Sequence, residues 1–222
     1  MDLQISFIEF IITKIFLPKD LTRNLLEFHV VPYKKFNIKI KPNREPNLRI
    51  RLDSILIKPE HILLFSSWID KKDPSHYYTK KNIPYRFRLL YRASRDGYTA
   101  EKFHDKCDYK RATVVVTKIQ NSEQIVGGYN PLSWNSYSGC MSTNDSFLFS
   151  FVNRNNLQSA KMGYVKDVTN AVECYSNIGP AFGKDDLFCY DNCAWSSYSK
   201  SYPNIDIPTE FNVDDYEVFK VC

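Results

Sequence analysis

The 222-residue sequence predicts an α+β fold that is mainly β: a two-layer β-sandwich flanked by a few short helices, with a small helical or extended N-terminal appendage. Three observations lead to this prediction. From residue 85 onward, short apolar runs rich in aromatic and β-branched side chains alternate with turn residues. Hydrophobic residues make up 43% of the chain, which is enough for a packed core. Many short strands with few helices are typical of a sandwich.

We assign residues 85–222 to one domain and expect its strands at regular intervals, separated by turns that contain Asn, Ser and Asp. The predicted strands lie near residues 86–92, 112–119, 124–129, 146–152, 161–166, 171–176, 185–190 and 215–221.

The stretch 87–108 is predicted to form a strand, a polar turn and a short helix in succession. Its first five residues are mostly apolar, as in a buried strand. Residues 94–97 end in Asp-Gly, which favours a tight turn. Thr99 then suits the N-cap of a helix, on which Phe103 and Cys107 share one face because they lie four residues apart.

Residues 1–84 are predicted to form the N-terminal appendage. Its helices are expected near residues 3–17, 19–28 and 59–70. The third helix begins with Pro59, which suits a first helical turn, and is expected to dock on the domain through Trp68. Two alternating runs between residues 29 and 53 predict edge strands or an extended linker, and residues 71–84 a loop.

The apolar segment 3–17 does not meet the requirements of a membrane span. Its fifteen residues fall short of the roughly 20 that a helix needs to cross a bilayer, and Glu9 and Lys14 interrupt them. Asp2 stands where a signal peptide would carry a basic residue. We therefore expect no stable membrane insertion and a cytoplasmic location.

The basic charge of the chain lies outside the predicted domain. Residues 1–84 contain 15 basic and 9 acidic side chains, whereas residues 85–222 contain 15 and 16. Between residues 33 and 51 there are seven basic side chains and one acidic one. This run could contact phosphate or an anionic membrane, but a solvated linker requires fewer assumptions. Because no aromatic ladder interleaves it, we expect no nucleic-acid partner.

The six cysteines do not form a recognisable metal motif. Three residues separate Cys189 from Cys193, and no second pair of Cys or His residues follows at zinc-finger spacing. Without a convincing secretion signal, reduced thiols are expected. We predict no metal site and no cofactor.

Few residues could carry chemistry. His104 and Cys107 would be neighbours on a helix, the minimum for a nucleophile and its base, but we favour an exposed His104 beside a half-buried thiol. Asp185 and Asp186 could act as acid and base or hold a cation, although an exposed acidic turn explains them more simply. If Glu217 is buried it needs a cationic partner.

Arg95 is our candidate for that partner. Arg95 and Asp96 could instead bind a ligand or satisfy each other in an Asx-type turn, which we favour. Gly127 and Gly128 lack the Lys-Ser/Thr of a phosphate loop, so they predict a bulge or a close backbone approach. The loop 179–183 is predicted to fold inward on Phe182.

Several motifs follow one another in a fixed order. They are FRLLYRASRDGYTAEKFHDKCD (residues 87–108), ATVVV (112–116), IVGGYNPLSW (125–134), DSFLFSF (145–151), GPAFGKDDL (179–187) and DYEVF (215–219). In this order they resemble the TLDc domain, a module of oxidation-resistance proteins and of regulators of the vacuolar-type proton pump. The resemblance covers roughly residues 86–222 and implies the same β-sandwich architecture. The candidate signature and interaction residues are Ser94, Arg95, Asp96, Gly97, Gly127, Gly128, Trp134, Gly179, Phe182, Gly183, Asp186 and Glu217.

Three functions follow from these patterns. The resemblance implies a non-enzymatic interaction domain that protects against oxidative stress and binds the peripheral sector of the proton pump. Residues 17–70 resemble the joining segment of fungal BTB-BACK-TLDc proteins, which implies a substrate-recruiting module on a BTB and cullin scaffold. No BTB-sized domain precedes this segment, which leaves two explanations: the chain is a shortened form of such a protein, or its gene model is incomplete. An enzyme that uses Asp96, Asp185, Asp186 or His104 is the third alternative, and we assign no catalytic residue.

Overall fold

The computed structural model describes residues 51–190 and 194–222, which belong to one compact unit. The predicted helices near 3–17 and 19–28, the alternating runs up to residue 50 and Cys193 lie outside the described residues.

The described residues are mainly β, with eleven strands and three α-helices. The helices are α3 (Pro59–Ile69), α4 (Ala93–Asp96) and α5 (Ala100–Cys107), and the 3-10 turns are η1 (Pro74–His76), η2 (Leu157–Ser159) and η3 (Val168–Asn170). The strands are β1 (Phe87–Arg92), β2 (Thr113–Ile119), β3 (Ile125–Asn130), β4 (Gly139–Met141), β5 (Phe147–Phe151), β6 (Ala160–Tyr164), β7 (Val172–Cys174), β8 (Ala181–Phe182), β9 (Leu187–Cys189), β10 (Ala194–Ser196) and β11 (Glu210–Val221).

Backbone hydrogen bonds join all eleven strands into one large antiparallel sheet. The two-layer β-sandwich that we predicted is therefore not shown. The order is β4-β7-β8-β9-β10-β11-β2-β3-β5-β6, and β1 pairs with β11. The reason is the length of β11, which is twelve residues long and starts five residues before its predicted beginning. Its first residues pair with β10 and the rest pair with β2 and β1.

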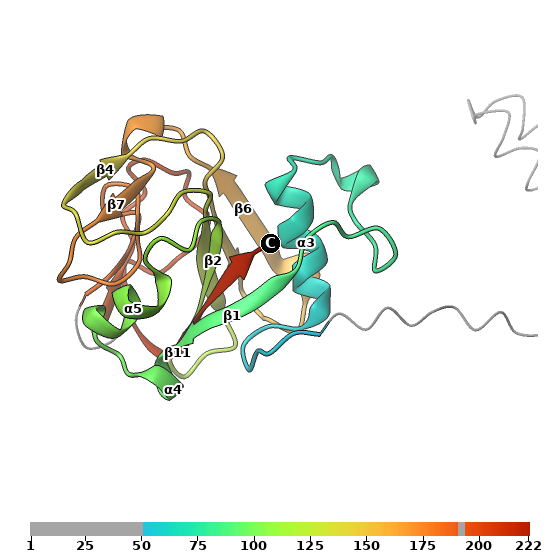
Figure 1. The fold of residues 1–222 in the computed structure, drawn as a ribbon. Helices are drawn as coiled ribbons and strands as arrows, with labels where there is room; N and C mark the ends of the chain where they lie inside the picture. Colours follow the sequence, from blue (N-terminus) through green and yellow to red (C-terminus); the bar gives the residue numbers. More distant parts are fainter. Residues whose placement is uncertain (1–50, 191–193) are drawn as a thin grey trace, which may run out of the picture. The chain divides into compact units, whose positions relative to one another are not determined.

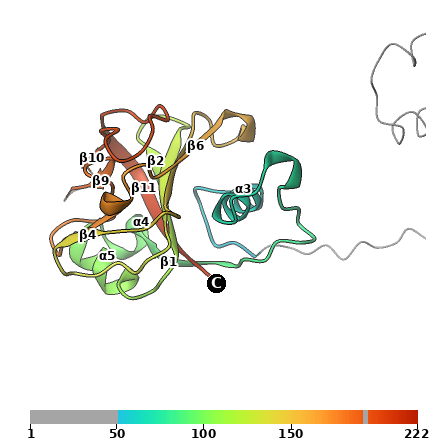
Figure 2. The same cartoon turned by 90° about the horizontal axis from the view of Figure 1, so that it is seen from above.

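The sheet has a core on each side of its β2–β3–β5 part. Val115 of β2 belongs to a core shared with β7–β10 and α5, whereas Val114 and Val116 belong to a core shared with α3. Figure 2 shows this arrangement, with α3 on one side of β2 and β11 and with β9, β10 and α5 on the other. Because both faces are covered, β2 is a continuous apolar run rather than an alternating one.

All eight predicted strands are present, although several bounds differ. The very short β4, β8 and β10 were not predicted. Instead of a simple tight turn, residues 93–96 form the single-turn helix α4, and Gly97 ends it with φ +105°. This backbone conformation favours glycine. Thr99 caps α5 as predicted, since its Oγ1 accepts a hydrogen bond from the backbone N–H of Lys102 at 3.4 Å.

Helix α3 lies beside the sheet (Figure 1). It covers one core and docks through Trp68, as predicted. The rings of Phe65 and Trp68 pack against the aromatic row of β5, with Phe65 4.6 Å from Phe149 between ring centroids. The helix therefore shares its core with the sheet, although we assigned residues 1–84 to a separate appendage.

Helix α3 contains a buried histidine, His61. Its ring is buried against Phe151, and its Nδ1 accepts a hydrogen bond from the N–H of Lys58 at 3.1 Å. Burial lowers the pKa of His61 below its ordinary value of 6.5. Because the unfolded chain binds the proton more readily, the neutral ring stabilises the fold above pH 6.5, and this contribution is lost as the pH falls toward the lowered pKa.

We expect His61→Gln to remove this pH dependence, because a glutamine at this position can still accept the hydrogen bond from Lys58. Urea unfolding between pH 7 and pH 5 should show a steeper loss of stability in the natural chain, with a difference in slope of up to about 1.4 kcal/mol per pH unit. The exposed His76 provides the control, since His76→Gln should leave the slope unchanged. Parallel curves for the natural chain and His61→Gln would contradict the prediction.

Candidate functional site

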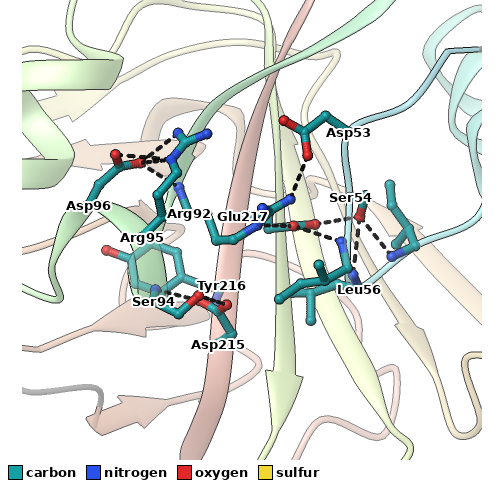
Figure 3. A network of polar contacts seen from close by, with 12 residues as sticks. Asp53, Ser54, Leu56, Arg92, Ser94, Arg95, Asp96, Asp215, Tyr216 and Glu217 are labelled. Carbon is teal, nitrogen blue, oxygen red and sulfur yellow. Dashed lines mark hydrogen bonds and ion pairs between the residues drawn. The ribbon is translucent and has the colours of Figure 1, made fainter.

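A polar network joins the segment 51–57, the end of β1, helix α4 and β11 (Figure 3). Arg92 lies at its centre. Its Nε donates to Oε1 of Glu217 at 2.7 Å, and its Nη2 donates to Oδ1 of Asp53 at 2.9 Å. Arg92 and Glu217 are direct partners in the register of β1 and β11, so the pairing of the two strands places the two charges together.

Glu217 is completely buried, and its carboxylate accepts three hydrogen bonds. Besides Arg92 it accepts hydrogen bonds from the Ser54 hydroxyl at 2.5 Å and from the backbone N–H of Ile55 at 3.0 Å. Three donors from two segments offset the cost of burying the charge. They also fasten the segment 51–57 to the sheet.

Asp96 forms the second branch of the network. It accepts a hydrogen bond from the backbone N–H of Arg92 at 3.0 Å, and its Oδ2 pairs with Nη2 of Arg95 at 2.7 Å. The Arg95 guanidinium lowers the pKa of this carboxyl. Arg95 also donates to the carbonyl of Leu90 at 3.3 Å. Local pairing of Arg95 with Asp96, which we favoured over ligand binding, is therefore observed.

Ser94 fastens α4 to β11. Its backbone N–H donates to Oδ1 of the buried Asp215 at 3.0 Å, and its hydroxyl donates to Oδ2 at 2.5 Å. Tyr91 fixes the end of the same turn, because its hydroxyl donates to the carbonyl of Gly97. The signature residues 94–97 thus hold β1, α4 and β11 together.

The predicted pairing of Arg95 with Glu217 is wrong. Glu217 is buried and has a cationic partner, as we required, but this partner is Arg92. The physical reason is that β1 ends at Arg92 directly opposite Glu217, and α4 then turns Arg95 toward Asp96. The charge of Arg92 at the end of an apolar strand could have indicated a buried partner. Nothing in the sequence around Ser54 indicated that its hydroxyl would bond to Glu217.

A second polar cluster surrounds Asp186, which we expected in an exposed acidic turn. Asp186 is instead buried, and its carboxylate accepts hydrogen bonds from the backbone N–H groups of residues 200, 201 and 202, each at 2.8 Å. Burial raises the pKa of Asp186, and these donors act in the opposite direction. Its neighbour Asp185 lies nearer the surface and pairs with Lys200 at 2.6 Å.

Gly183 is required beside this carboxylate. Its φ is +62°, and a Cβ there would lie 2.2 Å from Oδ2 of Asp186. The loop 179–183 does fold inward on Phe182, which is completely buried. The motif GPAFGKDDL (residues 179–187) therefore holds a loop around a buried carboxylate.

We expect Asp186→Asn to destabilise the protein by about 2–3 kcal/mol, because the amide group replaces an acceptor that faces a buried backbone N–H. Asp185→Asn is the matched control and should cost less than about 1 kcal/mol, since it removes only a surface ion pair. Urea midpoints of the two variants measure the difference. Equal costs would show that the buried carboxylate is not needed to hold residues 200–202.

The remaining signature residues lie in the core. Trp134 is buried and its Nε1 donates to Oγ1 of Thr113 at 2.8 Å. A Cβ on Gly127 would lie 2.0 Å from the carbonyl oxygen of Val115, which confirms the predicted close backbone approach. Cβ atoms on two other glycines would lie 2.7 Å from the Phe182 ring (Gly128) and 2.9 Å from Sγ of Cys189 (Gly179).

His104, which we expected to be exposed, is buried, and both of its ring nitrogens lie within hydrogen-bond distance of oxygen atoms. Nδ1 lies 2.8 Å from Oδ1 of Asp108, and Nε2 lies 2.9 Å from the carbonyl oxygen of Tyr175. Both nitrogens thus have partners other than Cys107. Burial raises the pKa of the Cys107 thiol well above its ordinary value, which disfavours the thiolate that a nucleophile needs.

The signature residues do not converge on one pocket. Arg95, Asp96 and Glu217 belong to the first network, Asp186 belongs to the second, and the glycines and aromatic residues serve packing. Within residues 51–190 and 194–222, no group of three His, Cys, Asp or Glu side chains could hold a metal ion. No helix among these residues is long and apolar enough to cross a membrane.

Comparison with protein families gives a match to the TLDc domain over residues 50–222. The match includes α3 and begins well before residue 86, where the resemblance in the motifs starts. A search of the curated proteins found no match.

Proposed function

Because the chain belongs to the TLDc family, we propose that it is a non-enzymatic interaction domain that protects against oxidative stress by binding the vacuolar-type proton pump and regulating its assembly. The main support is that its polar signature residues are engaged in contacts within the domain. Arg92 neutralises the buried Glu217, and Arg95 neutralises Asp96, so we infer that these residues hold a shape that a partner can bind.

The contacts of the other candidate catalytic residues also support a non-enzymatic role. A general base needs a free acceptor within reach of a substrate proton, but Asp186 accepts from three backbone N–H groups. His104 contacts a carboxylate and a carbonyl oxygen. The high pKa of Cys107 is equally unfavourable for a direct antioxidant role of this thiol.

Purification of the tagged full chain from cell extract tests the proposal. We expect subunits of the peripheral sector of the proton pump to be enriched with it, and we expect the purified chain to change ATP hydrolysis by that sector. A tagged protein of similar size and net charge serves as the control, because nonspecific ionic attraction would enrich the pump equally. No enrichment over this control, together with unchanged hydrolysis, would refute the proposal.

The ubiquitin-ligase alternative depends on residues 17–70, of which 17–50 lie outside the described residues. No contact in the described part of the chain favours it over the pump. The same purification distinguishes the two, because a ligase module would bring down a cullin scaffold rather than pump subunits.

A further inference from the structure

A groove of about 850 Å³ runs beside β1 and is separate from the signature residues. Its apolar lining comes from Leu52, Phe87 and Leu89. Its charged lining comes from the three arginines Arg51, Arg86 and Arg88 and from one carboxylate, Asp53. One side is therefore β1 itself, and the other side is the start of the segment that Ser54 and Asp53 fasten to the network.

The side of β1 that faces away from β11 has no strand partner in the described part of the chain. Arg86 exchanges both backbone hydrogen bonds with Cys222, each at 2.9 Å. Because residues of an antiparallel pair alternate between bonded and non-bonded positions, Phe87 and Leu89 direct their N–H and C=O groups toward the outer edge. Such an edge is a template for another extended segment.

The groove carries an excess of positive charge. All three arginines are exposed, and none of them has an ion-pair partner among residues 51–190 and 194–222. The one carboxylate in the lining, that of Asp53, is paired with Arg92 at 2.9 Å. An occupant of this groove would therefore bring negative charge.

We propose that this groove binds an extended acidic segment of a partner protein, which adds to the outer edge of β1 as a further strand. Successive residues of a strand face opposite sides. In the partner segment, acidic residues would alternate with apolar ones, the former beside Arg86 and Arg88 and the latter beside Phe87 and Leu89. The proposal uses the general role of the domain in binding proteins, but it does not require the proton pump as the partner.

Fluorescence anisotropy with the purified full chain tests this directly. The probe is a labelled short peptide of alternating Glu and Val, compared with one of alternating Gln and Val. We expect the Glu peptide to bind at least about tenfold more tightly at low salt. We expect Arg86→Glu combined with Arg88→Glu to abolish this preference. Lys106→Glu combined with Lys110→Glu reverses the same charge outside the groove and should retain it.

A second peptide separates strand addition from simple attraction of charge. N-methylation of alternate backbone nitrogens retains every carboxylate but removes hydrogen-bond donors, so we expect it to weaken binding by about tenfold. Equal binding of the Glu peptide and its N-methylated form would overturn the proposal and leave a simple anion site. Displacement of these peptides by inorganic phosphate at matched ionic strength would overturn it in the same way. No preference for Glu over Gln would also overturn it. Because no pump subunit is present, these outcomes are independent of the proposed function.

Discussion

Arg92→Met should lower the free energy of unfolding by about 3–5 kcal/mol, because it leaves the buried carboxylate of Glu217 without its cation. The hydrogen bonds from Ser54 and Ile55 remain, but they do not neutralise the charge. For a domain of this size such a loss corresponds to a fall in melting temperature of roughly 6–20 °C. Urea unfolding of the natural chain and the variant measures it.

Two further variants identify the cause of this loss. Glu217→Gln in the Arg92→Met background removes the unpaired charge while keeping an acceptor for Ile55, so we expect at least about half of the stability to return. Arg95→Met removes a partly exposed ion pair and should cost less than about 1 kcal/mol. If Arg95→Met costs as much as Arg92→Met, or the double variant recovers nothing, the assignment of Arg92 as the essential partner fails.

Gly127→Ala is expected to destabilise the protein by about 3 kcal/mol or more, because the new methyl group would lie 2.0 Å from a backbone oxygen of the neighbouring strand. The obstacle is Val115, whose carbonyl belongs to the central strand β2 and cannot rotate away as a side chain could. Displacing it would disturb the cores on both sides of the sheet.

Gly139→Ala is the matched comparison. No heavy atom lies within 4 Å of a Cβ at that position, so only its φ of +153° opposes the change, and we expect a cost of about 1 kcal/mol. Thermal unfolding of both variants gives the ranking. A Gly139→Ala variant as unstable as Gly127→Ala would show that the lost flexibility of glycine, rather than the close approach, determines both effects.

The sequence predicted elements well where local patterns are sufficient. Strand β2 was recognisable because five consecutive β-branched residues, 113–117, are typical of a strand that is buried on both faces. Helix α5 was recognisable because Thr99 and the Phe103–Cys107 spacing satisfy its cap and its core. The strands β8 and β10 have two and three residues, too few for a periodic pattern to stand out.

The charged pairs could not be predicted in the same way. Arg92 meets Glu217 because β1 and β11 are in register across 125 positions of sequence, and Arg95 was equally plausible from composition alone. The burial of Asp186 depends on a turn at residues 200–202, which supplies all three donors. Neither arrangement has a local signal, because each is created when distant segments pack together.

The position of β11 has a consequence for how the molecule assembles. Until residues 210–221 are in place, β10, β2 and β1 each lack a neighbour that β11 provides. A newly made chain must therefore keep these edges from associating with other chains while the intervening residues are synthesised, which makes slow folding and early dependence on chaperones the expected behaviour. Insertion of β11 closes all of these edges in one step and converts separate pieces of sheet into a cooperative whole.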